Sequence, residues 1–342
     1  MLILNEQQVH QCLHLRECLE VNRQAFIALA QGQATVPSRL GLPYHSVSTE
    51  GTTPDWTLFK PAATSDTMGC KIVSVRSNNP AKGLPLVPAT ILHLNAETGR
   101  VDAVLDGTSL TAARTAAGSA LATALAWQGK EVQHLMVFGA GLQAELHIQM
   151  IAEALPQRLL SQLTIVNRTP ERAVALWNKI QSMCAEGKIA FDKIAHCQIL
   201  ALDDTAQIAQ ALSTASCIVT CTNTATPLFD GNIVLPAGCH LNSIGSYTPD
   251  MQEIPTETTI RQCRVWIDTP EARAVGDLKD LPSEHPVTLL GEVLQQDYEP
   301  AETQLPCTFF KSVGTAIQDV MTASVVVKKA RELGIGTEIE MS

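Results

Sequence analysis

The sequence is poor in aromatic residues and has no concentration of positive charge. Trp, Tyr and Phe make up 4% of its 342 residues, and 24 Lys and Arg are outnumbered by 34 Asp and Glu, for a formal net charge of -10. Nucleic acids and anionic membranes require clustered cations, and single-stranded bases also require aromatic stacking. The composition therefore argues against nucleic-acid and membrane partners, but it leaves room for a small cationic site that binds an anionic metabolite.

Targeting and metal-binding patterns are also missing. The chain begins Met-Leu-Ile-Leu-Asn-Glu, without the basic start and apolar run of a secretory signal. The longest uncharged stretch, 205–229, is rich in Thr, Ser, Gln and Asn, which indicates a helix and a buried strand rather than a membrane span. Ten cysteines without a CxxC pair are typical of reduced thiols, so we expect a cytoplasmic protein. Cys217 and Cys221 are interpreted as core residues of a strand, not as metal ligands.

The length of the chain predicts about two domains, at roughly 150 residues each. A helix is expected around 15–30, followed by a polar stretch interrupted by prolines. Short β runs separated by turn residues then predict an antiparallel sheet. These runs are Lys71–Arg76, Ala89–Leu94 and Val101–Leu105. An Ala-rich helix follows from Ser109 to about Trp127.

After Gly129 the pattern changes to alternating strands and helices, which predicts a parallel doubly wound sheet. A last helix is expected over 314–333, before Gly334. The other predicted helices are 142–155 and one that begins at Pro170, a favoured first helical residue. The predicted strands are 132–138, 163–166, 199–202, 217–221, 240–244 and 265–267.

The sharpest local motif lies between the first of these strands and its helix. It reads Gly139-Ala140-Gly141-Leu142-Gln143-Ala144, a GxGxxA pattern. The first glycine permits the turn, the second lets the backbone approach a pyrophosphate, and the alanine lets helix and strand pack closely. The N–H groups at the helix start would then face the phosphates. The motif predicts a dinucleotide site.

The end of the next strand bears on which cofactor binds. Many NAD enzymes carry a carboxylate there for the ribose 2′-hydroxyl, but this chain has Asn167-Arg168-Thr169. A guanidinium and a hydroxyl suit a 2′-phosphate, so NADPH is predicted in preference to NADH. The alternative is that Arg168 is a solvated loop cation.

The chain resembles the ornithine cyclodeaminase/μ-crystallin family over nearly its whole length. The motifs that carry the resemblance are Gly69–Val73, Leu110–Ala117, the Gly139 loop with Gln143, His240–Gly245, and Phe310–Gly314 followed by Asp319. The resemblance implies an α/β fold in which a Rossmann-type domain (131–312) is inserted into a substrate-binding and dimerisation domain (1–130 plus 313–342). It also implies a homodimer and chemistry on small α-imino or α-amino acids.

The resemblance further implies that Arg39, Lys71 and Arg114 bind the substrate carboxylate, and that Lys71 and Arg114 are catalytic. Guanidinium groups clamp a carboxylate at two points, and a lysine beside them adds charge and a transferable proton. Two positions depart from the family pattern. Lys60 replaces a Met and either adds positive charge near the substrate or points to solvent. Tyr247 replaces an Asp that handles the substrate amine in cyclodeaminases, and it either donates a hydrogen bond or walls the site.

Cofactor contacts are expected from the glycine loop, from 167–169, and from residues near the nicotinamide: Thr222, Ser243, Gly245 and Val313. The sequence as a whole predicts an NADPH-dependent reductase that converts Δ1-pyrroline-2-carboxylate or Δ1-piperideine-2-carboxylate to L-proline or L-pipecolate. Three alternatives remain open: an NAD-dependent ornithine cyclodeaminase, an alanine-type dehydrogenase, and a non-catalytic binding protein for NADPH and a small ligand. Tyr247 weakens the first, because a phenol lacks the permanent negative charge that would pair with a second ammonium group.

Overall fold

A computed structural model describes residues 1–44, 55–127, 134–155, 160–187, 194 and 196–340, except 296–304. The chain forms two compact units, and the second is an insertion in the first. The first unit contains residues 1–114 and 315–342, and the second contains 115–314. The helix α3 (Thr108–Ala126) begins in the first unit and ends in the second, whereas the sequence places the boundary after that helix. Domain limits at residues 130 and 312 stay a prediction.

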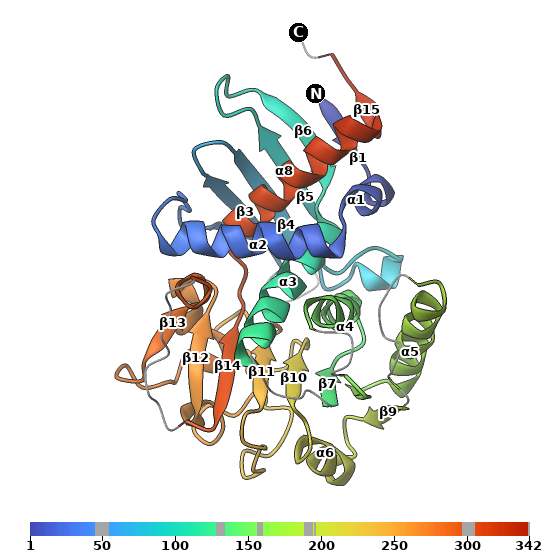
Figure 1. Ribbon diagram of the computed structural model, residues 1–342, viewed down its shortest axis with the longest axis vertical. Coiled ribbons are helices and arrows are strands. Elements are labelled where there is room, and N and C mark those ends of the chain that lie inside the picture. Colours follow the sequence, from blue (N-terminus) through green and yellow to red (C-terminus); the bar gives the residue numbers. More distant parts are fainter. Residues whose placement is uncertain are drawn as a thin grey trace. The chain divides into compact units, whose positions relative to one another are not determined.

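The first unit contains a seven-stranded mixed sheet with helices against one face (Figure 1). Its helices are α1 (Glu6–Cys12), α2 (Leu15–Ala30) and α8 (Ala316–Leu333), and α8 packs on β3, β4 and β5. The strands, in spatial order, are β15 (Thr337–Glu338), β1 (Leu2–Leu4), β6 (Val101–Asp106), β5 (Ala89–Leu94), β4 (Met68–Val75), β3 (Asp55–Ala63) and β2 (Leu40–Tyr44). The chain from β2 to β6 pairs antiparallel throughout, which confirms the predicted antiparallel sheet.

Close packing of α8 on this sheet depends on a glycine. A Cβ added at Gly69 on β4 would lie 2.7 Å from the Leu92 carbonyl oxygen and 3.2 Å from Cγ2 of Val320 on α8. At the start of α8, Oε1 of Gln318 accepts a hydrogen bond from the backbone N–H of Thr315 at 3.3 Å, and Gly334 ends the helix with a φ of +65°. These signals fix the first turn of α8, and Asp319 with it, against the strand that carries Lys71.

The second unit is a parallel eight-stranded sheet. Its strands, in spatial order, are β13 (Val287–Leu289), β12 (Cys263–Ile267), β14 (Cys307–Lys311), β11 (His240–Ser243), β10 (Cys217–Thr220), β7 (His134–Phe138), β8 (Gln162–Asn167) and β9 (His196–Ala201). The connecting helices are α4 (Leu142–Ala154), α5 (Pro170–Ala185), α6 (Thr205–Leu212) and α7 (Leu290–Val293). The strand order reverses direction between β7 and β10, the place where doubly wound sheets bind ligands. The α/β fold class with a Rossmann-type unit is confirmed.

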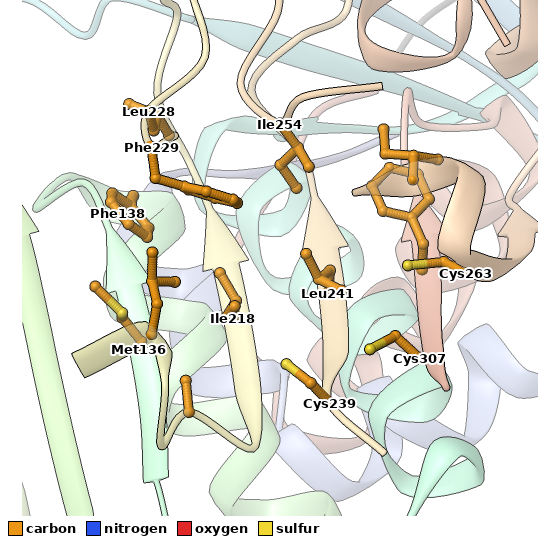
Figure 2. Packing of buried hydrophobic residues seen from close by; sticks show 14 of the residues in the cluster. Met136, Phe138, Ile218, Leu228, Phe229, Cys239, Leu241, Ile254, Cys263 and Cys307 are labelled. Atoms are coloured by element: carbon orange, nitrogen blue, oxygen red, sulfur yellow. The ribbon is translucent and has the colours of Figure 1, made fainter. Parts of the chain in front are cut away.

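One hydrophobic cluster of the second unit lies on one face of the sheet. Figure 2 shows Met136, Ile218 and Leu241, from three adjacent strands, in one layer with Phe138 and Phe229. Cys239, Cys263 and Cys307 lie at one end of the same cluster. Strands that are buried at every position, such as β7 and β10, are typical of a parallel sheet that helices cover on both sides.

Several elements match the sequence predictions closely, and others do not. The predicted limits of α2 and β5 agree with the structure, and stretch 205–229 forms a helix and a strand as expected. The sequence patterns predict no strand in 40–63, but the structure contains β2 and β3 there. Their prolines, Pro43 and Pro61, hide the alternating pattern that identifies strands. Residues 132–133, predicted as strand, lie outside the described residues.

Candidate functional site

Two lysines lie side by side on the face of the first sheet that α8 covers. Lys60 on β3 is directly opposite Lys71 on β4, so both side chains stand on the same face of the sheet. Lys60 is 5% exposed and Lys71 is 1% exposed. Lys60 therefore does not point to solvent, and its role toward the substrate stays a prediction. Arg39 precedes β2 and is next in register to Lys60, since Leu40 pairs with Phe59.

Asp319, on the first turn of α8, is the hub of this cluster. Its Oδ1 accepts hydrogen bonds from Nζ of Lys71 at 2.8 Å and from Nε of Arg114 at 2.7 Å. Nζ of Lys71 also donates to the hydroxyl of Thr111 on α3, at 3.2 Å. Three elements that are far apart in the sequence therefore bring two predicted site residues, Lys71 and Arg114, to one carboxylate.

The cluster shifts the pKa values of its members in ways that follow from charge and burial. Although burial opposes ionisation, the charges of Arg114, Lys71 and Lys60 lower the pKa of Asp319 to about 2. The pKa of Lys71 falls well below its ordinary value, because burial and the positive charges of Arg114 and Lys60 outweigh the attraction of Asp319. An ammonium group with a lowered pKa gives up a proton more readily than an ordinary lysine, which is the property required of a proton donor.

The cluster also retains unused hydrogen-bonding capacity. Arg114 is 4% exposed, and apart from its bond to Asp319 it makes one long contact of 3.5 Å from Nη1 to Oε1 of Gln318. Its Nη2 has no acceptor among the described residues, and the buried Oδ2 of Asp319 has no donor among them. Gln318 donates to the carbonyl oxygen of Arg114 and to Asn22, which holds the α3 and α8 ends together. A fixed guanidinium with a spare donor is well suited to bind a carboxylate.

Arg39 occupies a more open position than the other predicted substrate residues. It is partly exposed and makes no hydrogen bond with another described residue. The structure therefore brings Lys60, Lys71 and Arg114 together, and it places Arg39 beside them by strand register alone.

The glycine loop of the second unit has the geometry that a dinucleotide requires. Gly139 adopts a φ of +116°, and an added Cβ would lie 2.9 Å from the carbonyl oxygen of Cys221. A Cβ at Gly141 would meet nothing within 4 Å, so this side of the loop is open to a ligand. Ala144 is fully buried against the sheet, and the buried Oε1 of Gln143 has no hydrogen-bond partner among the described residues. These features fit a pyrophosphate at the N-terminus of α4.

The residues predicted to select the cofactor follow β8. Asn167 donates from Nδ2 to the carbonyl oxygen of Thr169 at 2.8 Å, which shapes the turn. Arg168 is exposed, and its side chain makes no hydrogen bond or ion pair with another described residue. It stands at the strand end where doubly wound folds bind the ribose of the cofactor.

Buried carboxylates that the sequence analysis did not single out tie the neighbouring loops together. Glu253 accepts from the backbone N–H groups of Thr222 and Gly245, at 2.6 and 2.7 Å. Asp268 accepts from the N–H groups of Val313 and Gly314, at 2.8 and 2.6 Å. Thr222, Gly245 and Val313 are predicted cofactor residues, so the carboxylates hold the backbone around them. Each of these N–H groups lies 8 to 46 residues in the sequence from the carboxylate that accepts its hydrogen bond. No local motif therefore connects the carboxylates with their partners.

A third carboxylate, Asp277, pairs with a buried lysine. Lys311 donates to Ser246 and Ser243, and its Nζ lies 3.3 Å from Oδ2 of Asp277. Ser243 also donates to Asp277 and is fully buried, so its hydroxyl is engaged within the protein. The predicted contact between Ser243 and the cofactor stays a prediction. Because the hydroxyl is engaged, that contact would involve the backbone of Ser243.

Two buried histidines belong to the framework. His240 donates or accepts at Thr308 and Asn242, packs against Trp127 and Trp266, and has its pKa lowered by burial to about 3. Burial lowers the pKa of His147 to about 4. Both are therefore neutral at physiological pH and structural in character.

Tyr247 is half-buried and has no hydrogen-bond partner among the described residues. Burial and the charge of Asp250 raise its pKa, so the phenol stays protonated and neutral. No described group of His, Cys, Asp and Glu side chains could hold a metal ion, and no described helix is long and apolar enough to cross a membrane.

The fold and the glycine loop define the class first: a two-domain protein with a Rossmann-type dinucleotide-binding unit. Comparison with known sequences then identifies the family. The chain belongs to the ornithine cyclodeaminase/mu-crystallin family, whose model matches residues 1–334.

Curated relatives in this family match the chain along most of its length. A Δ1-pyrroline-2-carboxylate reductase of Colwellia psychrerythraea is 31% identical over 96% of this chain and 99% of its own. An uncharacterised cyclodeaminase of Dictyostelium discoideum is 31% identical over the full length of both chains. The mouse ketimine reductase mu-crystallin is 30% identical over 78% of this chain and 77% of its own.

Solved structures of similar proteins agree with the fold. Thermococcus litoralis Δ1-pyrroline-2-carboxylate reductase, solved with NADH and L-proline, superposes with a TM-score of 0.84 at 26% identity and covers 99% of this chain and 100% of its own. An archaeal alanine dehydrogenase dimer with bound NAD has a TM-score of 0.85 at 24% identity and covers 100% of this chain and 99% of its own. At that identity the second likeness supports the fold alone.

Proposed function

We propose that the protein is a nicotinamide-dependent reductase of cyclic ketimine carboxylates. Its substrates would be Δ1-pyrroline-2-carboxylate, reduced to L-proline, and Δ1-piperideine-2-carboxylate, reduced to L-pipecolate. The observation that carries the proposal is the buried Lys71–Asp319–Arg114 cluster, which offers a fixed guanidinium beside a lysine of lowered pKa. The names of the Colwellia and Thermococcus relatives support the same reaction.

Each side chain of the cluster has a distinct task in this proposal. Arg114 binds the α-carboxylate through the donor that Asp319 leaves unused, and Arg39 and Lys60 add positive charge on the same sheet face. Lys71 holds a proton at Nζ and gives it to the imine nitrogen, which becomes the secondary amine of the product. Asp319 fixes both cations in place. Tyr247 is assigned a neutral part in lining the site, because a protonated phenol carries no charge for a second ammonium group.

The cofactor in the proposal is NADPH, with NADH the weaker ligand. When bound, it supplies the hydride that reduces the C=N bond. The loop residues 139–144 would hold its pyrophosphate, and 167–169 the 2′-phosphate of its adenosine ribose. The exposed guanidinium of Arg168, which has no partner among the described residues, supports the choice of NADPH.

The assembly and location complete the proposal. We assign residues 1–130 and 313–342 to substrate binding and dimerisation, and 131–312 to the cofactor. We also propose that the protein is a homodimer. No two of the described cysteines form a disulfide, and burial raises the pKa of several of them, which is consistent with reduced thiols in the cytoplasm.

A substrate panel tests the proposed reaction. Oxidation of NADPH is measured with the five- and six-membered imines and repeated with NADH, alongside pyruvate with ammonia, and ornithine with NAD. We expect turnover of at least one cyclic imine and no release of ammonia from ornithine. The proposal fails if every cyclic imine is inert while the cofactor binds, which would favour a binding protein. It also fails if ornithine or pyruvate is the better substrate.

Variants of Arg114 test its proposed role in binding the substrate carboxylate. Removing the guanidinium in Arg114→Met should lower kcat/KM by about 100-fold, since a hydrogen bond to a charged group contributes roughly 1.5–3 kcal/mol. Arg114→Lys keeps the charge but loses the fork, so we expect an intermediate loss. The Kd of NADPH should not change in either variant. Unchanged kcat/KM in a folded Arg114→Met protein would refute the assignment.

A further inference from the structure

Glu253 is fully buried, and each of its two carboxylate oxygens accepts two hydrogen bonds. Oε1 accepts from the backbone N–H of Thr222 at 2.6 Å and from its hydroxyl at 2.7 Å. Oε2 accepts from the backbone N–H of Gly245 at 2.7 Å and from the hydroxyl of Thr220 at 2.9 Å. One side chain thus joins the loop that follows β10 to the loop that follows β11.

The two loops touch at the point where Glu253 joins them. A Cβ added at Gly245 would lie 1.6 Å from the carbonyl oxygen of Thr222 and 2.6 Å from Oε1 of Glu253. Only glycine fits this approach, because any side chain would have to displace backbone. The spacing of the two loops is therefore set by the carboxylate and by the missing side chain together.

Glu253 is itself held in position. Oδ1 of Asp277 accepts from the N–H groups of Glu253 and Ile254, at 2.6 and 2.9 Å, and Lys311 neutralises the other side of Asp277. Both carboxylates and the lysine are 0% exposed. Such a satisfied polar network is rigid, and partial loss of its bonds is costly.

In a doubly wound sheet, each half of the sheet binds one half of a dinucleotide. The glycine loop and Arg168 lie on the β7–β8 half, which leaves the β10–β11 half for the nicotinamide nucleotide. We infer that Glu253 is a positioning residue that presents the backbone of Thr222 and Gly245 to the nicotinamide half of the cofactor, an inference that rests on the proposed function. It acts through these loops and does not touch the reacting atoms.

The simpler alternative is that Glu253 contributes only to stability. The two roles predict different changes in the affinity for the whole cofactor and in the affinity for a fragment of it. A positioning role lowers the affinity for the whole dinucleotide and spares a fragment that occupies only the adenosine half. A purely structural role lowers the melting temperature and changes affinity for both ligands equally, or for neither.

The experiment compares two ligands in one variant. Glu253→Gln replaces an oxygen that accepts two bonds with an amide NH2 that cannot accept any. We measure by calorimetry the Kd of NADPH and that of adenosine 2′,5′-bisphosphate, together with the melting temperature. The Kd of NADPH should rise at least about tenfold, the loss expected from one charge-assisted hydrogen bond, while the Kd of the fragment should stay within about twofold.

Two further variants keep the test decisive. Glu257→Gln removes an exposed carboxylate that pairs with Arg261 on the surface, so neither Kd should change. If Glu253→Gln does not fold, Thr220→Val removes a single donor to the same carboxylate and should weaken NADPH alone, by a smaller factor.

The outcomes separate this inference from the proposed function. Equal losses for both ligands, or unchanged NADPH affinity in a folded Glu253→Gln or Thr220→Val protein, would overturn the inference. If the wild-type protein binds neither NADPH nor NADH, the proposed function fails instead. If it binds NADH better, ADP replaces the bisphosphate as the fragment, and the same comparison applies.

Discussion

The two units use buried charge in opposite ways. Among the described residues of the first unit, three cations are buried with one carboxylate: Lys60, Lys71 and Arg114 with Asp319. Among those of the second, three carboxylates are buried with one cation: Glu253, Asp268 and Asp277 with Lys311. The first unit thus carries side chains suited to an anion. In the second, the carboxylates bind backbone N–H groups and hydroxyls of the same unit.

This difference reflects which atoms are proposed to meet the ligand. A carboxylate substrate requires cationic side chains at fixed positions, so a carboxylate of the protein serves to hold those cations. A dinucleotide is bound largely by backbone groups, so there the carboxylates serve to hold the backbone. In both units the carboxylate positions the groups that we expect to bind.

The largest effect that would test the comparison concerns Asp319. Asp319→Asn removes the charge that Lys71 and Arg114 share, and leaves two buried cations uncompensated. We expect a loss of about 3–5 kcal/mol in the free energy of unfolding at neutral pH. Urea denaturation measures it, with Asp66→Asn, an exposed aspartate of the same unit, as the unaffected control. If Asp319→Asn loses no more free energy of unfolding than Asp66→Asn does, the cluster does not depend on this carboxylate.

The same variant predicts a pH dependence. The pKa of Asp319 is lowered from 3.8 to about 2, so its stabilising contribution is complete above about pH 4 and disappears as the pH falls through about 2. The stability difference between the wild-type protein and Asp319→Asn should therefore shrink across that interval. A difference that stays constant down to pH 2 would contradict the charge-based account.

The next effect in size concerns the exposed cation of the second unit. Arg168→Ala should raise the Kd of NADPH by about 10- to 100-fold, the value of one or two charge-assisted hydrogen bonds, and leave that of NADH nearly unchanged. Arg172→Ala removes a similar exposed cation four residues further along the chain and serves as the matched control. If NADPH and NADH lose affinity equally, Arg168 does not contact a 2′-phosphate.

Much of the fold could be predicted from local patterns. The Gly139 loop, the Pro170 helix start and the Gly334 helix end are short-range signals, and each stands where the sequence places it. The strands β2 and β3 could not be predicted, because Pro43 and Pro61 interrupt their alternation. Pairing with β4 and burial of one face stabilise β3 regardless, and neither is visible in a local window.

The candidate site was predictable only in part. Lys71 and Arg114 were identified through the family resemblance, whereas their chemistry depends on Asp319, which lies 248 residues from Lys71. Glu253 and Asp277 have no sequence signature at all, since their ligands are backbone N–H groups of distant loops. A buried carboxylate is recognisable only when its partners are known in space.

The smallest effect concerns Lys60, and it tests whether the cation excess of the first unit has a catalytic use. Lys60 lies directly opposite Lys71, and its positive charge helps to lower the pKa of Lys71. Burial and the charge of Arg114 lower this pKa more strongly, whereas the attraction of Asp319 raises it. Lys71 must be protonated to donate, so activity declines as the pH rises through its pKa. Lys60→Met should raise that pKa and move the basic limb of the kcat/KM profile to higher pH.

Lys60→Arg and the exposed-site control Lys82→Met should leave the limb in place. A limb that does not move in Lys60→Met would mean that the neighbouring charge serves the substrate or the fold, and not the proton on Lys71.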